Sequence, residues 1–60
     1  MANPTSIIIV DKHEAFRKGE LLTLKTLPDF EVVGEAASGE DALMLVSELV
    51  PEIVLLDLIV

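Results

Sequence analysis

Two aspartates stand at positions where their carboxylates could do chemistry. Asp11 directly follows the apolar run Ser6–Val10, and Asp57 lies inside the apolar segment Ile53–Val60. Ligands of open α/β sheets gather at the carboxyl ends of strands, where the strand order reverses. If the first strand lies between the other two, the two carboxylates become neighbours. Such a pair can bind a hard cation such as Mg2+ through oxygen, and a carboxylate nucleophile can accept a phosphoryl group as an acyl phosphate.

Each aspartate also has an ordinary structural interpretation. An aspartate after a strand is commonly a turn former or helix cap, and Asp11 has His13, Glu14 and Ala15 within reach for that purpose. For Asp57 this interpretation is weaker, because burying a charge among apolar residues is costly unless the charge is paired or reaches solvent. Charges in such surroundings concentrate at functional sites, which favours Asp57 as the reactive group.

The elements that must position these carboxylates alternate along the chain. We expect strands at about residues 6–11, 30–36 and 53–58, and helices at about residues 14–27 and 39–49. The first and third strands are nearly continuous apolar runs, which is typical of strands covered on both faces of a parallel sheet. The sequence therefore predicts an α/β fold, a parallel βαβαβ unit with right-handed crossovers.

The expected helix at residues 14–27 has an imperfect apolar face. Glu20 intrudes on the stripe, and Leu21 falls outside it, while Lys18 and Lys25 point away from it. Helical spacing predicts the following stripe and flanking residues: Phe16, Thr23 and Leu27, with Gly19 and Leu24 beside them.

The second expected helix is better specified. Ser38 is placed to cap its N-terminus, with Asp41 three residues later, and Pro51 stops the chain from continuing as a helix. Its predicted apolar face consists of Ala42, Leu45, Val46 and Leu49.

Length and composition narrow the class of protein. Sixty residues form at most one small domain, and the chain has no cysteine for a disulfide or thiolate metal site. No apolar run approaches the roughly 20 residues that span a bilayer, and the N-terminus lacks a basic signal-peptide region. We therefore expect a cytoplasmic location and no membrane partner. The net charge of −7 argues against direct nucleic-acid binding by this segment; it serves solubility, or favours a cation or a phosphoryl-handling partner.

The residues also resemble a known family. Ile7–Asp11 followed by His13, Leu27–Leu43, and Pro51–Leu58 are similar to the opening segments of bacterial response-regulator receiver domains of the NarL/FixJ type. The resemblance covers almost all of the chain after Ser6. It implies a flavodoxin-like fold with sheet order 2-1-3-4-5, of which this chain has the 2-1-3 part. It also implies that Asp57 is the phosphoacceptor, that Asp11 is one of two acids that organise Mg2+, and that the module is a signalling phosphoacceptor rather than an enzyme.

Two departures from the family pattern matter. Lys12 stands where the family usually has its second acid, and an ammonium group cannot ligate a cation. We therefore expect Mg2+ at Asp11 and Asp57 to bind weakly or not at all. Lys12 has two open interpretations: it pairs with Asp57 and mimics the cation, or it turns outward to solvent. In addition, the chain stops three residues after Asp57, so we expect an incomplete receiver whose remaining site residues and output domain are absent.

The resemblance and the pattern together imply partners. The family receives phosphoryl groups from a histidine kinase or phosphotransfer protein, commonly at the first helix, where Arg17, Lys18 and Lys25 lie, and relays the signal to transcription. The segment Ile53–Val60 is expected to be an edge strand, which predicts self-association or completion by another chain.

Three functions remain as hypotheses from the sequence. The first is a phosphorelay receiver acting through Asp57, and the second is a pseudo-receiver interaction module in which Lys12 has removed metal-dependent phosphorylation. The third, a Rossmann-like enzyme, is disfavoured because the segment Asp11–Gly19 has one glycine and no nucleotide-binding fingerprint.

Overall fold

The computed structural model describes residues 3–56, in which five elements alternate along the chain. They are β1 (Thr5–Val10), α1 (Glu14–Lys25), β2 (Phe30–Ala36), α2 (Gly39–Leu49) and β3 (Ile53–Leu56). The three strands form one parallel sheet in the order β2-β1-β3. The predicted α/β class and the 2-1-3 order are therefore confirmed.

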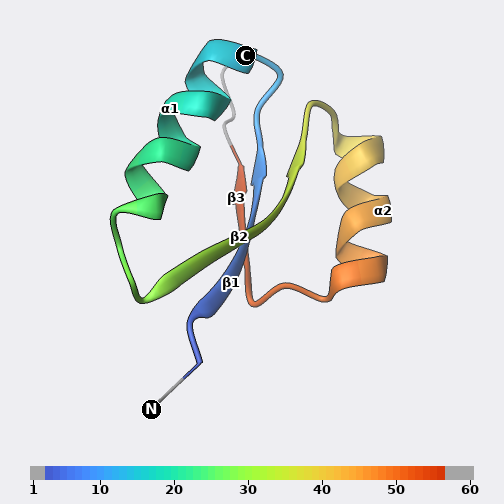
Figure 1. Cartoon of the computed structure of the whole chain (residues 1–60). Coiled ribbons are helices and arrows are strands. Elements are labelled where there is room, and N and C mark those ends of the chain that lie inside the picture. Colours follow the sequence, from blue (N-terminus) through green and yellow to red (C-terminus); the bar gives the residue numbers. More distant parts are fainter. Residues whose placement is uncertain (1–2, 57–60) are drawn as a thin grey trace.

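The two helices lie on opposite sides of the sheet (Figure 1). Both pack on β1 and β2, and over the described residues neither packs on β3. Both helices therefore lie over β1 and β2, and β3 is attached to the sheet through its pairing with β1. Neither helix has the length and apolar character of a membrane span.

The core lies between the sheet and α2. Ile8, Val10, Ala36 and Ala42 are buried together there, and Val33, Leu45 and Val46 pack against them. This confirms three members of the predicted α2 face, whereas Leu49 stays 43% exposed. Ile7 and Ile9 alternate to the other face of β1, where α1 lies, and both are buried.

Strand β2 contains an irregularity that brings α2 close to it. The pairing with β1 shifts between Ile7 and Ile8, so that Val33 is the extra residue of a bulge and Gly34 lies opposite Ile8. A Cβ atom on Gly34 would lie 3.2 Å from Leu49 Cδ1 and 3.3 Å from Leu45 Cδ1. The absent side chain therefore leaves room for α2 to approach the strand.

The ends of α2 are fixed by local interactions. As predicted, Ser38 caps the N-terminus, because its Oγ accepts a hydrogen bond from the Asp41 N–H at 3.2 Å. At the other end, Val50 adopts a left-handed conformation with φ 45°, and its N–H donates to Val46 O. This end is strained, since a β-branched residue rarely adopts that conformation.

Helix α1 differs from the prediction in its end and in its buried face. It ends at Lys25 rather than Leu27, because the Thr26 N–H bonds to Thr23 O in a tighter turn. Strand β1 likewise runs one residue earlier than expected, from Thr5 to Val10. The predicted buried face is confirmed only at Leu24, which is half-buried, whereas Phe16 is 58% exposed and Thr23 is exposed too. The other half-buried residues of α1 are Arg17, Glu20 and Leu21, and Leu21 was predicted to lie outside this face. Phe16 is exposed because α1 packs on β1 and β2, so that the side of the helix that carries Phe16 lies toward β3, on which α1 does not pack.

Candidate functional site

Asp11 lies at the carboxyl end of β1 and is almost completely buried, with 1% of its surface exposed. Its N–H donates to Ala36 O at 3.0 Å, which extends the β1–β2 pairing by one residue. Its Oδ1 accepts a hydrogen bond from the His13 N–H at 2.8 Å, and His13 Nδ1 lies 3.6 Å from the same oxygen. The carboxylate therefore forms the turn that leads into α1, as the structural interpretation of Asp11 predicts.

Arg17 connects this turn to the rest of the fold. Its Nη1 donates a hydrogen bond of 2.8 Å to the backbone carbonyl of Asp11, and its Nε lies 3.3 Å from Glu35 Oε1 near the end of β2. The Arg17 guanidinium thus connects α1, the loop after β1 and the C-terminal end of β2. From the sequence, Arg17 is expected only on a partner surface. Its helical spacing with Leu21 and Leu24 is the signal that could have predicted that it faces the sheet.

Lys12 does not join this network. Its side chain is exposed, and it makes no ion pair with any residue between 3 and 56. This agrees with the outward interpretation of Lys12, whereas the alternative contact with Asp57 involves a residue outside the described part of the chain. Glu14 is also turned away, since it pairs with Lys18 at 3.2 Å on the exposed side of α1.

Asp57, the predicted phosphoacceptor, lies outside the described residues. The described part of β3 ends at Leu56, which pairs with Val10, the residue before Asp11. The pairing register therefore aligns the residues that precede the two aspartates in the sequence.

The described residues do not by themselves make a Mg2+ site. Mg2+ is held by near-octahedral oxygen ligands that usually include one or two carboxylates. No group of three metal-ligating side chains occurs in residues 3–56. Within residues 3–56, Asp11 is the one buried carboxylate, and its Oδ1 accepts the hydrogen bond from His13 that forms the turn.

Comparison with curated proteins identifies the family. Over 53 residues, or 88% of this chain, the sequence is 40% identical to the transcriptional regulatory protein LiaR of Bacillus subtilis. It is 47% identical over 53 residues to the response regulator protein VraR of Staphylococcus epidermidis. It is 40% identical over 55 residues to the nitrate/nitrite response regulator protein NarL of Escherichia coli, with 92% of the chain covered. These homologues are response regulators, and the similarity identifies the chain as a NarL-like receiver fragment.

The match concerns a limited part of the relatives. The chain spans about a quarter of the length of these regulators, between 25% and 26%. No protein-family model matches the chain, and no solved structure matches it. The family assignment agrees with the fold, because a parallel β-α-β-α-β unit of order β2-β1-β3 is part of the flavodoxin-like receiver fold.

Proposed function

We propose that this segment is the phosphoryl-accepting part of a two-component receiver and that Asp57 is the acceptor. The observation that carries the proposal is the register of β1 and β3, in which Val10 and Leu56 are paired partners. Each precedes an aspartate in the sequence, and Asp11 lies at the carboxyl edge where α/β sheets bind ligands.

In the proposed reaction, a carboxylate oxygen of Asp57 attacks the phosphorus of a phosphohistidine. The phosphorus–nitrogen bond breaks, the histidine leaves with the electron pair, and an acyl phosphate forms on the aspartate. Asp11 and its turn position the neighbouring edge of the sheet. Arg17 holds that turn against α1 and β2, so its role is to position rather than to react.

Lys12 gives the second candidate function, a pseudo-receiver that binds partners without being phosphorylated. An acid-to-lysine exchange changes the local charge by two units, and each unit pair at 4 Å is worth about 4 kcal/mol at an effective dielectric near 20. In water the same pair is worth about 1 kcal/mol. Because Lys12 is exposed, the smaller penalty applies. The exposure of Lys12 therefore favours weakened Mg2+ binding over complete loss of Mg2+ binding. This in turn favours the phosphoryl-accepting receiver over the pseudo-receiver.

The proposed partners follow from the family. A histidine kinase or phosphotransfer protein would dock on α1, where Lys18 and Lys25 are exposed. Transcription control through an output domain is supported by relatives named as transcriptional regulatory proteins. We propose a cytoplasmic location and no direct nucleic-acid contact by this segment, whose net charge is −7.

The test places residues 1–60 in a complete receiver, by replacing the matching segment of Staphylococcus epidermidis VraR. The intact mass is measured after incubation with acetyl phosphate and Mg2+. A phosphoryl adduct that disappears in Asp57→Asn supports the receiver.

An adduct seen only after Lys12→Asp would instead identify the segment as a pseudo-receiver. If a folded chimera gives no adduct with either residue at position 12, the phosphoacceptor proposal is refuted.

A further inference from the structure

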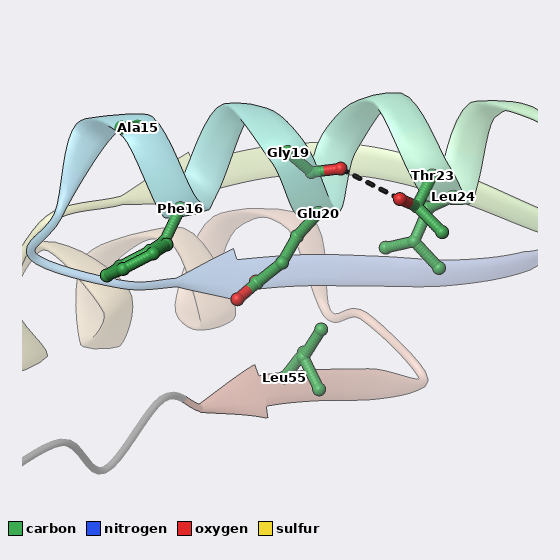
Figure 2. A pocket seen from close by; sticks show the side chains of 7 residues that line it. All are labelled: Ala15, Phe16, Gly19, Glu20, Thr23, Leu24 and Leu55. Atoms are coloured by element: carbon green, nitrogen blue, oxygen red, sulfur yellow. Dashed lines mark hydrogen bonds between the residues drawn. The ribbon is translucent and has the colours of Figure 1, made fainter.

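A groove lies between α2 and the carboxyl end of β2, and we call it the α2 groove. It has a volume of about 480 Å³ and is open to solvent. In the receiver sheet order 2-1-3-4-5, β2 is the outermost strand, so later strands add beyond β3 and not beside this groove. The groove beside β3, which Phe16 and Leu55 line, borders the side that later strands extend (Figure 2). The α2 groove is therefore the one whose surroundings the described elements define.

The floor of the α2 groove is apolar. Ala36, at the end of β2, is buried, and Leu45 is half-buried against the core. Met44 lines the groove as well and is 63% exposed. A methionine side chain is flexible and polarisable, so an exposed methionine adapts its shape to the apolar side chains of a partner. The floor therefore offers a site for an apolar side chain.

The rim of the α2 groove is acidic. Glu35, Asp41 and Glu48 line it and are exposed. Arg17 lies beside them, but its guanidinium is already bound to Glu35 and to the backbone carbonyl of Asp11. Within residues 3–56, the carboxylates of Asp41 and Glu48 form no ion pair. Two negative charges therefore remain at the rim for a cationic ligand.

The charge along the whole chain has the same polarity. All four lysine and arginine residues lie between positions 12 and 25, so residues 26–60 contain acids and no lysine or arginine. Helix α2 has Glu40 and Asp41 in its first turn and no basic residue in its last turn. The side of the fold that carries α2 therefore attracts cationic partners and repels acidic ones.

The apolar floor and the acidic rim together select one kind of ligand. A metal ion fits poorly, because residues 3–56 contain no group of three metal-ligating side chains and the floor is apolar. A nucleic acid would bring its phosphates against carboxylates. A second copy related by a two-fold axis would bring the acidic rim against itself. A cationic amphipathic helix fits, since such a helix lays its apolar face into a groove and leaves its charged residues at the edges.

We propose that the α2 groove binds a cationic amphipathic helix of a partner protein. An apolar side chain of that helix contacts Met44 and Leu45, and its lysine or arginine side chains lie beside Asp41 and Glu48. The apolar contact supplies most of the affinity, whereas the charges supply the rate of association and the selectivity. The proposal does not depend on phosphoryl transfer, since it uses neither of the two aspartates at the carboxyl ends of β1 and β3.

The test uses the complete receiver in which residues 1–60 replace the matching segment of Staphylococcus epidermidis VraR, so that later strands can pair with β3. The probe is a synthetic helical peptide of about 15 residues, with leucines on one face and lysines beside them. One matched peptide has glutamate in place of lysine, and another has serine in place of leucine. Fluorescence anisotropy measures binding. We expect only the first peptide to bind, with a Kd that rises as salt rises, because salt screens exposed charges.

Two pairs of variants locate the binding on α2. Met44→Ser should raise the Kd at least about tenfold, because it removes apolar contact area. Leu43→Ser changes a residue that is 72% exposed and does not line the groove, so it should leave the Kd unchanged. Glu48→Lys should raise the Kd about fivefold and weaken its salt dependence. Glu40→Lys makes the same charge change outside the groove lining and should alter the Kd less than about twofold.

Circular dichroism establishes that each variant folds, so that a change in Kd reports on binding. The proposal is overturned if the folded receiver does not bind the lysine–leucine peptide, or if the glutamate peptide binds equally well. Equal effects of the two variants in either pair overturn it too. Sedimentation of the receiver without peptide gives a further check. Self-association that Met44→Ser abolishes would identify a second copy as the occupant and would contradict the proposal.

Discussion

Arg17 offers the most decisive test of how the site is held together, because it makes two interactions of different strength. The perturbation is Arg17→Met, which keeps an aliphatic stem and removes the guanidinium. The hydrogen bond to the Asp11 carbonyl is 2.8 Å long and comes from a charged donor, and such bonds are worth about 1.5–3 kcal/mol. The pair with Glu35 is partly exposed on the Glu35 side and is worth about 0.2–1 kcal/mol. The backbone hydrogen bond should therefore dominate.

We expect Arg17→Met to lower the free energy of unfolding by about 2–3 kcal/mol. Glu35→Gln should cost less than about 1 kcal/mol, because the glutamine amide oxygen still accepts from Arg17. For a domain of this size, 1 kcal/mol corresponds to a shift in Tm of about 4–8 °C, so the two variants are easily distinguished. Lys18→Met is the matched control: its pair with Glu14 is fully on the surface, and we expect a cost of at most about 0.5 kcal/mol.

The assay is urea unfolding followed by far-ultraviolet circular dichroism, at low and high salt and at low protein concentration. The cost of Arg17→Met should survive high salt, because a bond to a backbone carbonyl is screened less than an exposed ion pair. Equal costs for Arg17→Met and Glu35→Gln would refute the reasoning. A cost of Arg17→Met that vanishes in high salt would refute it too.

Further predictions concern single local features and use the same unfolding measurement. Gly19→Ala should stabilise the chain by about 0.5–1 kcal/mol, because a Cβ there meets no atom within 4 Å in mid-helix. Gly34→Val should destabilise it by about 1–3 kcal/mol through overpacking against α2, and equal signs for these two glycine variants would contradict the packing argument. Ser38→Ala should cost about 1 kcal/mol through loss of the α2 cap, and Ser38→Gly only a few tenths. Val50→Gly should raise stability by about 1 kcal/mol because it relieves the left-handed strain, and a loss of stability would show that the φ of 45° is not costly.

The sequence by itself determined the elements, their order and the family. Apolar runs without alternation predict strands of a parallel sheet that are covered on both faces. The structure confirms this cover for β1, whereas the described residues of β3 remain 38–55% exposed. The cap at Ser38 was equally readable, since a helix cap depends on neighbours three residues apart. Asp11, which follows the Ser6–Val10 run, and the turn that it forms with His13 were also predictable from the sequence, because they depend only on neighbouring residues.

Only the tertiary structure decided how these elements meet. The link from Arg17 to Glu35 spans 18 positions and exists only once α1 lies across β1 and β2. The stripe that includes Phe16 has helical spacing, but periodicity cannot say which strand lies beneath a helix, and the stripe faces the groove beside β3 instead of the core. The close approach of α2 at Gly34 depends on a bulge in strand pairing, and register between distant segments is a property of the sheet rather than of either segment.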